Sequence, residues 1–575
     1  MEANKRSLGE ILSSDIRLVA PLFQRPYVWD RENNWEHLWS AMNELFERRL
    51  GDREIRPYFL GAVVLDKLRG ATGTVTSREI IDGQQRMITL QVLMQVAKEE
   101  LQELGQGNAV ALLDRVTMNI LGGDTDDRFK VWPTNIDRDQ YRDVMMGNPA
   151  IGRIQEIAEF YRPAFMKWLD PDSDGMEQRA KIFAASVTSD LVFVVIDLDL
   201  DDDGQLIFET LNSLGTPLLP SDLVKNLLFR EAIQGNNDTD NLYERYWKPF
   251  EEDNDYWRGK VKIGRRERNR IDVFLQHYLT YRLATEPNVA HLFRDYRDAY
   301  RDGKLGDVES ALSDFAELSQ LYEEFDEAES GASGSLRHVL HVLDISVLNP
   351  LILGINHKAA SSDDRDELLR ILESYVVRRF LCGKTTKNYN RMAVDLINTM
   401  EKRGWVPILL QAVLQASDAR TAIWPDDDAV LKHTLEKPAY GNIRRAGIGY
   451  VLGRVEADLR DGSTEVPWNT RTPLTLEHIM PQKWEDHWPL SDPGDMETEM
   501  AREDALHRMG NLTVLTRKLN SEVSHSPWVT KRAHFNEHSV LLINNALASL
   551  EDWDEKSIEK RGTYLSQKFC DIWPR

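Results

Sequence analysis

The sequence predicts an α+β protein of several domains, because its pattern changes twice along the chain. The first ~230 residues alternate short apolar runs with helical periodicity, which is typical of an α+β or α/β domain. Residues 240–417 are helical in pattern, and beyond about Pro425 glycine, proline and tryptophan interrupt short β-like runs. We therefore expect domains at 1–235, 236–425 and 426–575, the middle one helical.

The composition indicates a cytoplasmic protein with no membrane partner. The 575 residues are 42% hydrophobic, enough for several cores, yet no run of eighteen apolar residues and no secretory signal pattern occurs. Two cysteines, Cys382 and Cys570, are too few for a disulfide framework or a thiolate zinc site. Any metal must therefore bind through oxygen or imidazole.

The formal charge of −23 argues against a protein that coats nucleic acid without specificity. Two segments are nevertheless basic. Residues 260–270, KVKIGRRERNR, are best explained as a solvated charged face. Residues 506–534 hold a single acid, Glu522, and a set of cations that we expect to contact DNA: Arg508, Arg517, Lys518, Lys531 and Arg532.

Four apolar runs in the N-terminal region predict strands, at 16–19, 58–65, 79–81 and 191–198. Between the third and the fourth, apolar residues recur at helical spacing from Met87 to Leu101. This periodicity predicts one amphipathic helix over 84–101, behind the turn Asp82-Gly83.

The start of that helix reads IDGQQRMITL and is a candidate phosphate site. Backbone N–H groups at a helix N-terminus attract phosphate, Gly83 allows close approach, and Arg86 can add a bidentate contact. A capped helix with a polar first turn would give the same pattern. Asp82 would then cap the helix rather than help to hold Mg²⁺.

Two more N-terminal segments stand out: PLFQRPYVWD at 21–30 and FETLNSLGTPLLPSDLVKN at 208–226. Tyr27 and Trp29 could stack on a base, but ordinary core packing explains them equally well. In the second segment, Ser221 after Pro220 is the expected N-cap of a helix.

The C-terminal region contains a strand-strand-helix pattern with one polar residue in each element. Residues 474–482, LTLEHIMPQ, form a strand stopped by Pro481. In GNLTVLTRKLNSEVSH, Asn511 opens a second strand and Asn520 lies in a helix. A neutral imidazole at His478 can take a proton from water, and oxygen ligands can hold Mg²⁺ or Mn²⁺ on a phosphate. The pattern therefore favours phosphodiester hydrolysis.

These C-terminal motifs resemble the His-Me finger (HNH-type) nuclease domain, a ββα-metal fold, of the GmrSD-like restriction proteins. The resemblance implies that His478 is the general base, that Asn511 holds its imidazole through the side-chain carbonyl, and that Asn520 ligates the metal. It also implies Glu477 as a second ligand. Neighbouring residues of a strand point to opposite faces, so a surface or supporting carboxylate is the alternative for Glu477.

The N-terminal motifs DGQQR, QRPYVW and FETLNSLGTP resemble the GmrS-like half of the same proteins, whose core is ParB/sulfiredoxin-like. The resemblance covers about residues 8–230 and 430–560, and YVVRRFLCGKTTKNYNR at 375–391 looks like the helical connector. It implies binding and hydrolysis of a nucleoside triphosphate (GTP, CTP or ATP) by the following residues: Asp82, Gly83, Gln84, Gln85 and Arg86. Gln24 and Arg25 would complete that pocket or contact DNA.

The working hypothesis is a nucleotide-regulated, metal-dependent DNA endonuclease that nicks or cuts, and that restricts phage or other foreign DNA in a modification-dependent way. Two alternatives remain. One is a nucleotide-switched DNA-binding protein without cleavage, and the other is a nucleotide hydrolase that governs an unrelated partner. Whether the chain forms a homo-oligomer is open.

Overall fold

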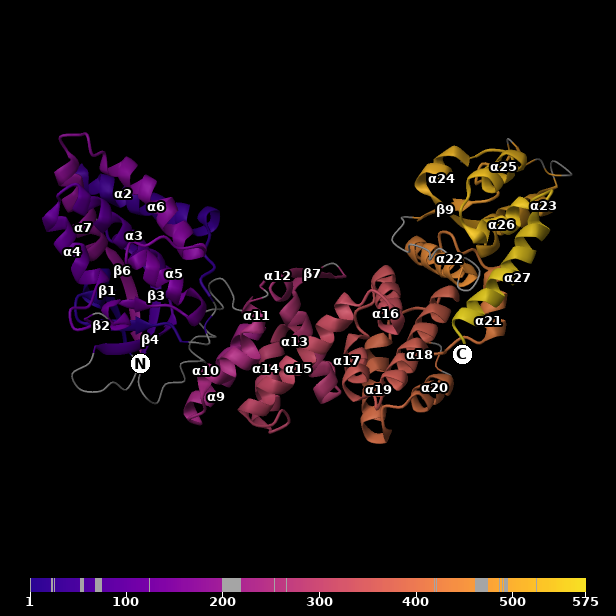
Figure 1. Cartoon of the computed structure of the whole chain (residues 1–575), viewed down its shortest axis with the longest axis horizontal. Helices are drawn as coiled ribbons and strands as arrows, with labels where there is room; N and C mark the ends of the chain where they lie inside the picture. The colour runs from indigo at the N-terminus through magenta and orange to yellow at the C-terminus, as the bar shows by residue number, and fades with distance from the viewer. Residues whose placement is uncertain are drawn as a thin grey trace. The chain divides into compact units, whose positions relative to one another are not determined.

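The computed structural model describes residues 2–575 apart from 22–23, 25, 52–55, 68–74, 124, 199–218, 253, 265, 418, 420, 461–473, 486, 489, 491–494 and 524. The chain forms two compact units, residues 1–239 and 240–575. Figure 1 labels their elements. Among the helices described, none combines the length and the apolar character that crossing a membrane requires.

The first unit contains a mixed six-stranded sheet in the order β1-β6-β3-β4-β2-β5. Its strands are β1 (Glu2–Ser7), β2 (Ile16–Val19), β3 (Tyr58–Lys67), β4 (Thr76–Asp82), β5 (Val131–Trp132) and β6 (Leu191–Asp197). Three neighbouring pairs are parallel, β6 with β3, β4 with β2 and β2 with β5, and the other two are antiparallel. The coarse α+β prediction is thus confirmed.

Helices cover one face of this sheet with the main core of the unit (Figure 1). They are α1 (Leu8–Leu12), α2 (Glu36–Leu50), α3 (Gln84–Glu103), α4 (Gly107–Thr117), α5 (Arg138–Met145), α6 (Arg153–Leu169) and α7 (Met176–Ser189). A further helix, α9 (Pro220–Gln234), contributes no residue to this core. A smaller apolar cluster around Val64 and Ile196 lies on the opposite face. Strand residues therefore alternate between two cores, as the pleat requires.

The predicted strands and the long helix of this unit are confirmed, with ends shifted by up to three residues. Two strands, β1 and β5, were not predicted, because β1 is polar and β5 is only two residues long. The predicted cap at Ser221 is wrong: α9 begins at Pro220, with Leu219 as the N-cap. Proline favours the first helical position because its φ is already helical and its missing N–H is not needed there.

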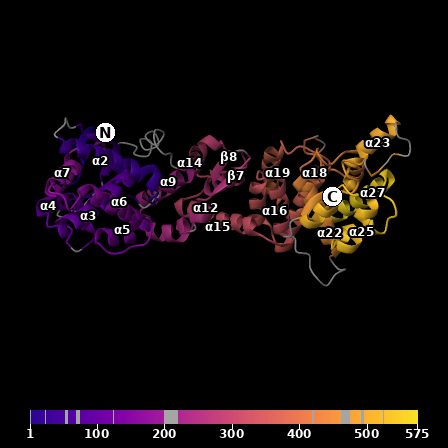
Figure 2. The same ribbon diagram turned by 90° about the horizontal axis from the view of Figure 1, so that it is seen from above.

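The second unit begins with a helical region. Its helices are α10 (Thr239–Leu242), α11 (Pro249–Glu252), α12 (Asn254–Trp257), α13 (Arg270–Leu283), α14 (Leu292–Arg301), α15 (Val308–Glu327), α16 (Gly331–Leu343), α17 (Asn349–Lys358), α18 (Ser362–Leu381), α19 (Tyr389–Arg403) and α20 (Pro407–Gln415). One antiparallel hairpin, β7 (Lys260–Ile263) with β8 (Arg266–Asn269), interrupts them (Figure 2).

The C-terminal part of this unit combines helices with a second hairpin. The elements are α21 (Asp427–Glu436), α22 (Arg445–Arg460), β9 (Leu474–His478), α23 (Met496–Leu506), β10 (Leu512–Thr516), α24 (Arg517–Val523), α25 (Trp528–His538), α26 (Leu542–Ala548) and α27 (Glu555–Ile572). Two buried arginines of α18 connect the helical region to the chain that follows it through hydrogen bonds to backbone carbonyls. Arg378 donates to the carbonyls of Trp573 and Pro425, and Arg379 donates to those of Thr421 and Ile423. The 375–391 motif therefore stabilises the packing between the helical region and the C-terminal part of this unit.

Candidate functional site

Strands β9 and β10 form an antiparallel hairpin that α24 follows directly. Cα partners run from His478 opposite Leu512 to Leu474 opposite Thr516, and α24 packs against both strands. The strand-strand-helix order expected from the sequence is therefore present. His478 ends β9, Asn511 lies immediately before β10, and Asn520 lies in α24.

The His478 imidazole is buried and meets other side chains at both nitrogens. The Gln482 amide nitrogen lies 3.4 Å from Nδ1, and Nδ1 of His507 lies 3.3 Å from Nε2. An amide nitrogen can only donate, so Nδ1 of His478 is the acceptor and Nε2 carries the proton toward His507. Burial, with His507 and Lys531 next in effect, lowers the pKa of His478 to about 3. The imidazole is thus neutral, with its lone pair at Nδ1.

One aromatic side chain, Tyr440, contacts both histidines of this pair. The Tyr440 ring meets His478 edge-on at a centroid distance of 4.5 Å and stacks on His507 at 5.5 Å. The Arg445 guanidinium lies over the Tyr440 ring, 4.3 Å from its centroid. These contacts restrict the two imidazoles to one arrangement.

Glu477, the residue before His478, is bound to a buried lysine. Lys531 Nζ donates to Glu477 Oε1 at 2.6 Å and to the His478 carbonyl at 2.8 Å. Burial raises the pKa of Glu477, while Lys531 opposes that shift, and burial likewise lowers the pKa of Lys531. The Lys531 side chain is fully buried. The expectation that Lys531 contacts DNA is therefore wrong, because a buried ammonium cannot reach a phosphate.

Asn511 has a different place from the one expected. Its Oδ1 accepts from Met480 N–H and Trp553 Nε1, and its Nδ2 donates to the carbonyls of Met480 and Leu506. The expected contact of its side-chain carbonyl with the imidazole is not formed. Asn511 instead fixes the backbone just beyond His478, and His507 takes the position beside the imidazole.

Asn520 and Glu477 supply the oxygen atoms available for a divalent cation. Asn520 Nδ2 donates to Thr475 Oγ1 at 2.8 Å and to the Leu476 carbonyl at 3.3 Å, which directs the side chain onto β9. Mg²⁺ accepts few protein oxygens and keeps several waters, so the Glu477 carboxylate of β9 and the Asn520 carboxamide of α24 are the oxygen ligands that could hold it. Within the described part of the chain, no three His, Cys, Asp or Glu side chains gather as a metal site.

The remaining predicted DNA contacts differ in exposure. Arg517 and Lys518 are exposed on α24. Arg532 is partly buried and donates to the Leu550 carbonyl at 3.2 Å, and Arg508 is partly buried as well. Two of the five cations, at the start of α24, are therefore the ones most open to a phosphate.

A groove of about 690 Å³ adjoins β9, between α16 and α22. Gly449 and Gly453 line it from α22, and an added Cβ at either would meet no atom within 4 Å. Glycine inside a helix costs about 1 kcal/mol relative to alanine. Packing would therefore allow alanine at both positions. Glycine there leaves the groove wider and makes α22 less stable.

In the first unit, the DGQQR residues lie where β4 passes into α3. Gly83 is the N-cap, with φ at +101°, and a Cβ there would meet Val63 Cγ2 at 2.8 Å. The position needs glycine both for its left-handed backbone and for packing against β3. No side chain caps this end of α3, whose first-turn N–H groups attract anions.

The side chains of this motif mainly contact the surrounding backbone. Gln85 accepts from Val28 N–H at 2.8 Å and donates to the Pro26 carbonyl, so it fixes the segment at 26–29. Arg86 donates to the Leu60 carbonyl at 2.6 Å and lies 3.5 Å from Asp82. Gln84 is buried beside them.

Gln24 donates to the carbonyls of Ile80 and Ile81 at the end of β4, which brings the 21–30 segment onto the motif. Its Oε1 is buried and has no hydrogen-bond partner among the described residues. Together with the uncapped α3, this orphaned acceptor fits a polar ligand. Arg25 and residues 208–218 lie outside the described residues.

The two aromatic residues of QRPYVW pack internally. Tyr27 is buried, its hydroxyl contacts Thr89 and accepts from Trp35 Nε1, and Trp29 packs against the same core. Of the two explanations for this pair, core packing is the one the fold provides. Tyr27 is therefore closed to a base, while Trp29 stays partly exposed.

Two protein-family models match the chain in the regions that hold these motifs. The GmrSD restriction endonuclease, N-terminal domain, matches residues 8–229, and the GmrSD restriction endonucleases, C-terminal domain, matches residues 424–568. A comparison with curated proteins gave no match. The two matches define a restriction protein in which both domains share one chain. The protein belongs to the GmrSD-like restriction proteins, as the motifs indicated.

Sequence reasoning missed three residues of the C-terminal site: His507, Tyr440 and Gln482. Only Gln482 lies near His478 in the chain, in the motif EHIMPQ, and its spacing of four was a usable signal. His507 is 29 residues away and Tyr440 precedes the hairpin altogether. Glu79 in β4 was also missed. Burial and the facing Asp66 raise its pKa to about 7.

Proposed function

We propose that this protein is a metal-dependent DNA endonuclease whose cutting centre is the β9-β10-α24 segment, a His-Me finger of the HNH type. The observation that carries the proposal is the buried, neutral imidazole of His478 at the end of β9, with its proton directed to His507. A general base needs an available lone pair at working pH and a fixed ring orientation. His478 has both.

In this mechanism, Nδ1 of His478 takes a proton from a water molecule whose oxygen attacks phosphorus. The bond from phosphorus to the leaving sugar oxygen breaks, and that oxygen is protonated by solvent. A divalent cation, when bound, supplies charge stabilisation at the phosphate and at the leaving oxygen. Glu477 and Asn520 would hold it, and Asn511 keeps the backbone after His478 in place.

DNA would approach along the groove beside β9. Arg517 and Lys518 are exposed cations at the start of α24, and Arg445 is exposed at the start of α22, beside Tyr440. A phosphate backbone needs such charges together with room for close approach. The open helix face at Gly449 and Gly453 gives that room.

The N-terminal unit would bind a nucleoside triphosphate, GTP, CTP or ATP, at the start of α3, and would regulate cutting as a ParB-like sensor. The uncapped helix end and the orphaned Gln24 Oε1 support this assignment. The Arg86 guanidinium already binds Leu60 and Asp82, so its role is to shape the site unless a phosphate displaces the carbonyl. Modified phage or foreign DNA in the cytoplasm is the proposed target.

The test is cleavage of supercoiled plasmid by the full chain with Mg²⁺ or Mn²⁺, with and without each triphosphate. His478→Ala should lower the cutting rate by about 10²–10⁴-fold, the usual contribution of a general base. The matched control is His487→Ala, since His487 is an exposed histidine of the same part of the chain. Cutting by His478→Ala at the wild-type rate would disprove the assignment.

A DNA-binding protein without cleavage is the second candidate, and one observation favours it. The Lys531 ammonium already pairs with the Glu477 carboxylate. A carboxylate that binds a metal ion would need to be free of this partner. In this case DNA should bind with a nucleotide-dependent affinity while plasmid stays intact under every metal tested. Matched modified and unmodified plasmids complete both tests.

A further inference from the structure

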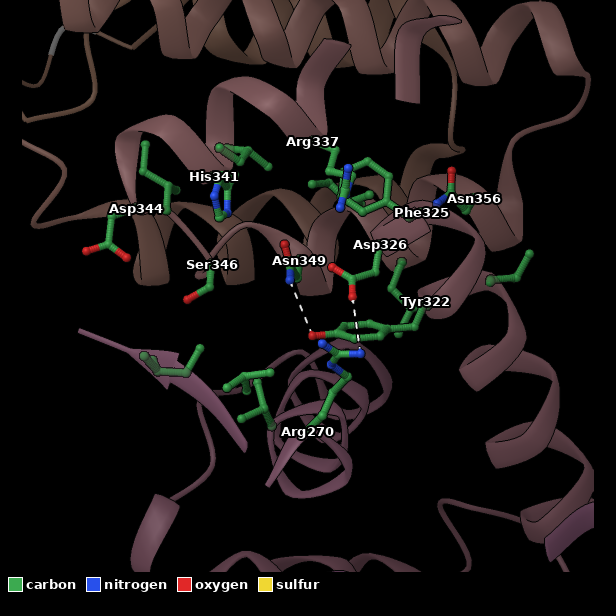
Figure 3. A pocket seen from close by; sticks show the side chains of 18 of the residues that line it. Arg270, Tyr322, Phe325, Asp326, Arg337, His341, Asp344, Ser346, Asn349 and Asn356 are labelled. Carbon is green, nitrogen blue, oxygen red and sulfur yellow. Dashed lines mark hydrogen bonds and ion pairs between the residues drawn. The ribbon is translucent and has the colours of Figure 1, made fainter. Parts of the chain in front are cut away.

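The helical region of the second unit contains a cavity that none of the above uses. It has a volume of about 420 Å³ and is lined by residues of α13, α15, α16, α17 and β7 (Figure 3). Its apolar walls include Phe325, Leu340 and Leu353. Mostly apolar cavities of 300–1,000 Å³ with a few placed polar groups are typical of small-molecule sites.

The polar lining of this cavity combines two carboxamides and the Tyr322 hydroxyl with charged side chains of both signs. Asn349 Nδ2 donates to the Tyr322 hydroxyl at 3.4 Å, and Nδ1 of His277 lies 3.2 Å from that hydroxyl. Burial lowers the pKa of His277 to about 3, so this imidazole is neutral. The oxygen of Asn356 is buried and has no hydrogen-bond partner within the described chain. A buried orphaned acceptor calls for an N–H donor from a ligand.

The side of the cavity next to β7 carries the cations Lys262 and Arg270, with Asp326 paired to Arg270. Arg270 lies 3.9 Å from the Tyr256 ring centroid and 3.7 Å from Asp326, which hold its guanidinium at the cavity (Figure 3). The hairpin adds the exposed cations Lys260, Lys262 and Arg266, against one exposed acid, Glu267. Among the strands that the structure describes it pairs with no other, and a two-stranded ribbon of this kind fits the major groove of DNA.

We propose that this cavity binds a nucleobase attached to phosphate, with the ring beside Tyr322 and Phe325, an exocyclic or ring N–H on Asn356, and phosphate toward Arg270 and the hairpin. The volume, the flat aromatic walls and the unpaired carboxamide oxygen select a planar ring with N–H donors. Two sources share this chemistry: a free nucleotide, and a base turned out of DNA held by the hairpin. The DNA source rests on the proposed function, whereas the free nucleotide does not.

Photocrosslinking with two reactive bases, each in two forms, tests the site. The probes are 5-iodouracil and 8-azidoadenine, each supplied as the free triphosphate and within duplex DNA, on the full chain. Label mapped by mass spectrometry to 321–356 supports the cavity, and the form that labels identifies the source. No label there from any of the four probes overturns the inference.

Variants make the test specific. Asn356→Leu removes the acceptor and should lower labelling at least tenfold, and Leu353→Trp should fill the cavity and abolish labelling. The control is Glu324→Trp, which adds the same ring at an exposed position of α15. Labelling that survives Asn356→Leu, measured at an unchanged melting temperature, refutes the site even if Leu353→Trp fails to fold.

Failure here is separable from failure of the proposed nuclease. His478→Ala should label at the wild-type level, because His478 lies in another part of the unit. Plasmid cutting without label in 321–356 overturns only the cavity. Label without cutting overturns only the nuclease.

Discussion

The two motif regions of this protein use their polar side chains differently. At the start of α3, Gln85, Arg86 and Gln24 bind backbone carbonyls and N–H groups of neighbouring segments. In the C-terminal hairpin, Asn511 does the same, but His478 meets only side chains, at 3.3 and 3.4 Å. Both regions carry motifs of one protein family, yet in the first the motif largely builds its own loop.

This difference separates supporting residues from reactive ones. A side chain with several short bonds to buried backbone is needed for the fold, since removing it leaves those groups unpaired. A side chain whose partners are long contacts to other side chains can exchange them for substrate. Mutations of the first kind should reduce stability, and those of the second kind should reduce activity alone.

The largest effect is expected for Asn511→Ala. It leaves two donors and two acceptors unpaired in a buried site, at about 1–3 kcal/mol each with partial relaxation, so the free energy of unfolding should fall by about 4 kcal/mol. Urea denaturation measures this loss. The control is Asn536→Ala, which is exposed on α25 and should change little. Normal stability with lost cutting would instead make Asn511 a reactive residue.

Next in size is Lys531→Met, which strands the Glu477 carboxylate in a buried position. Breaking a buried ion pair costs about 3 kcal/mol or more. Glu477→Gln in the same chain should restore most of that stability without restoring cutting. Lys560→Met, an exposed change on α27, is the control. A double variant as unstable as Lys531→Met would show that the two side chains are not coupled.

A smaller loss, about 2 kcal/mol, is expected for Gln85→Ala, since Val28 N–H and the Pro26 carbonyl lose their partner. Amide hydrogen exchange at Val28 should become faster. Gln102→Ala on the exposed face of α3 serves as the control. If exchange at Val28 is unchanged while nucleotide binding is lost, Gln85 contacts the ligand and the contrast between the two regions fails.

The smallest effect belongs to His507→Phe, which keeps the ring beside Tyr440 but removes the acceptor for the His478 proton. Stability should change by less than about 0.5 kcal/mol, and cutting should slow about tenfold, equivalent to about 1.4 kcal/mol. Plasmid cleavage and thermal melting measure the two quantities. His487→Phe makes the same exchange of imidazole for phenyl at an exposed position and is the control. Equal cutting by both variants would remove His507 from the site.

Much of the fold was predictable because local periodicity reports it. The strands at 16–19 and 191–198, the helix from Gln84 and the strand-strand-helix order all follow from apolar spacing and turn residues. Strand β1 was not, because it is polar and pairs with β6 almost 190 residues later. His478, Asn520 and Glu477 were named from motifs in adjacent stretches of the chain, and their roles stay predictions. Their contacts to His507 and Lys531 come from outside the hairpin, so local pattern does not report them.

The sequence by itself determined the order of elements, the membership in the GmrSD-like restriction proteins and the residues available for chemistry. Only the tertiary structure decided which polar groups meet: His507 rather than Asn511 beside the imidazole, Lys531 on Glu477, and Gln85 on the 26–29 segment. A hydrogen bond depends on ångström-scale positions set by register and packing across distant parts of the chain. Residue identity and spacing do not contain that information.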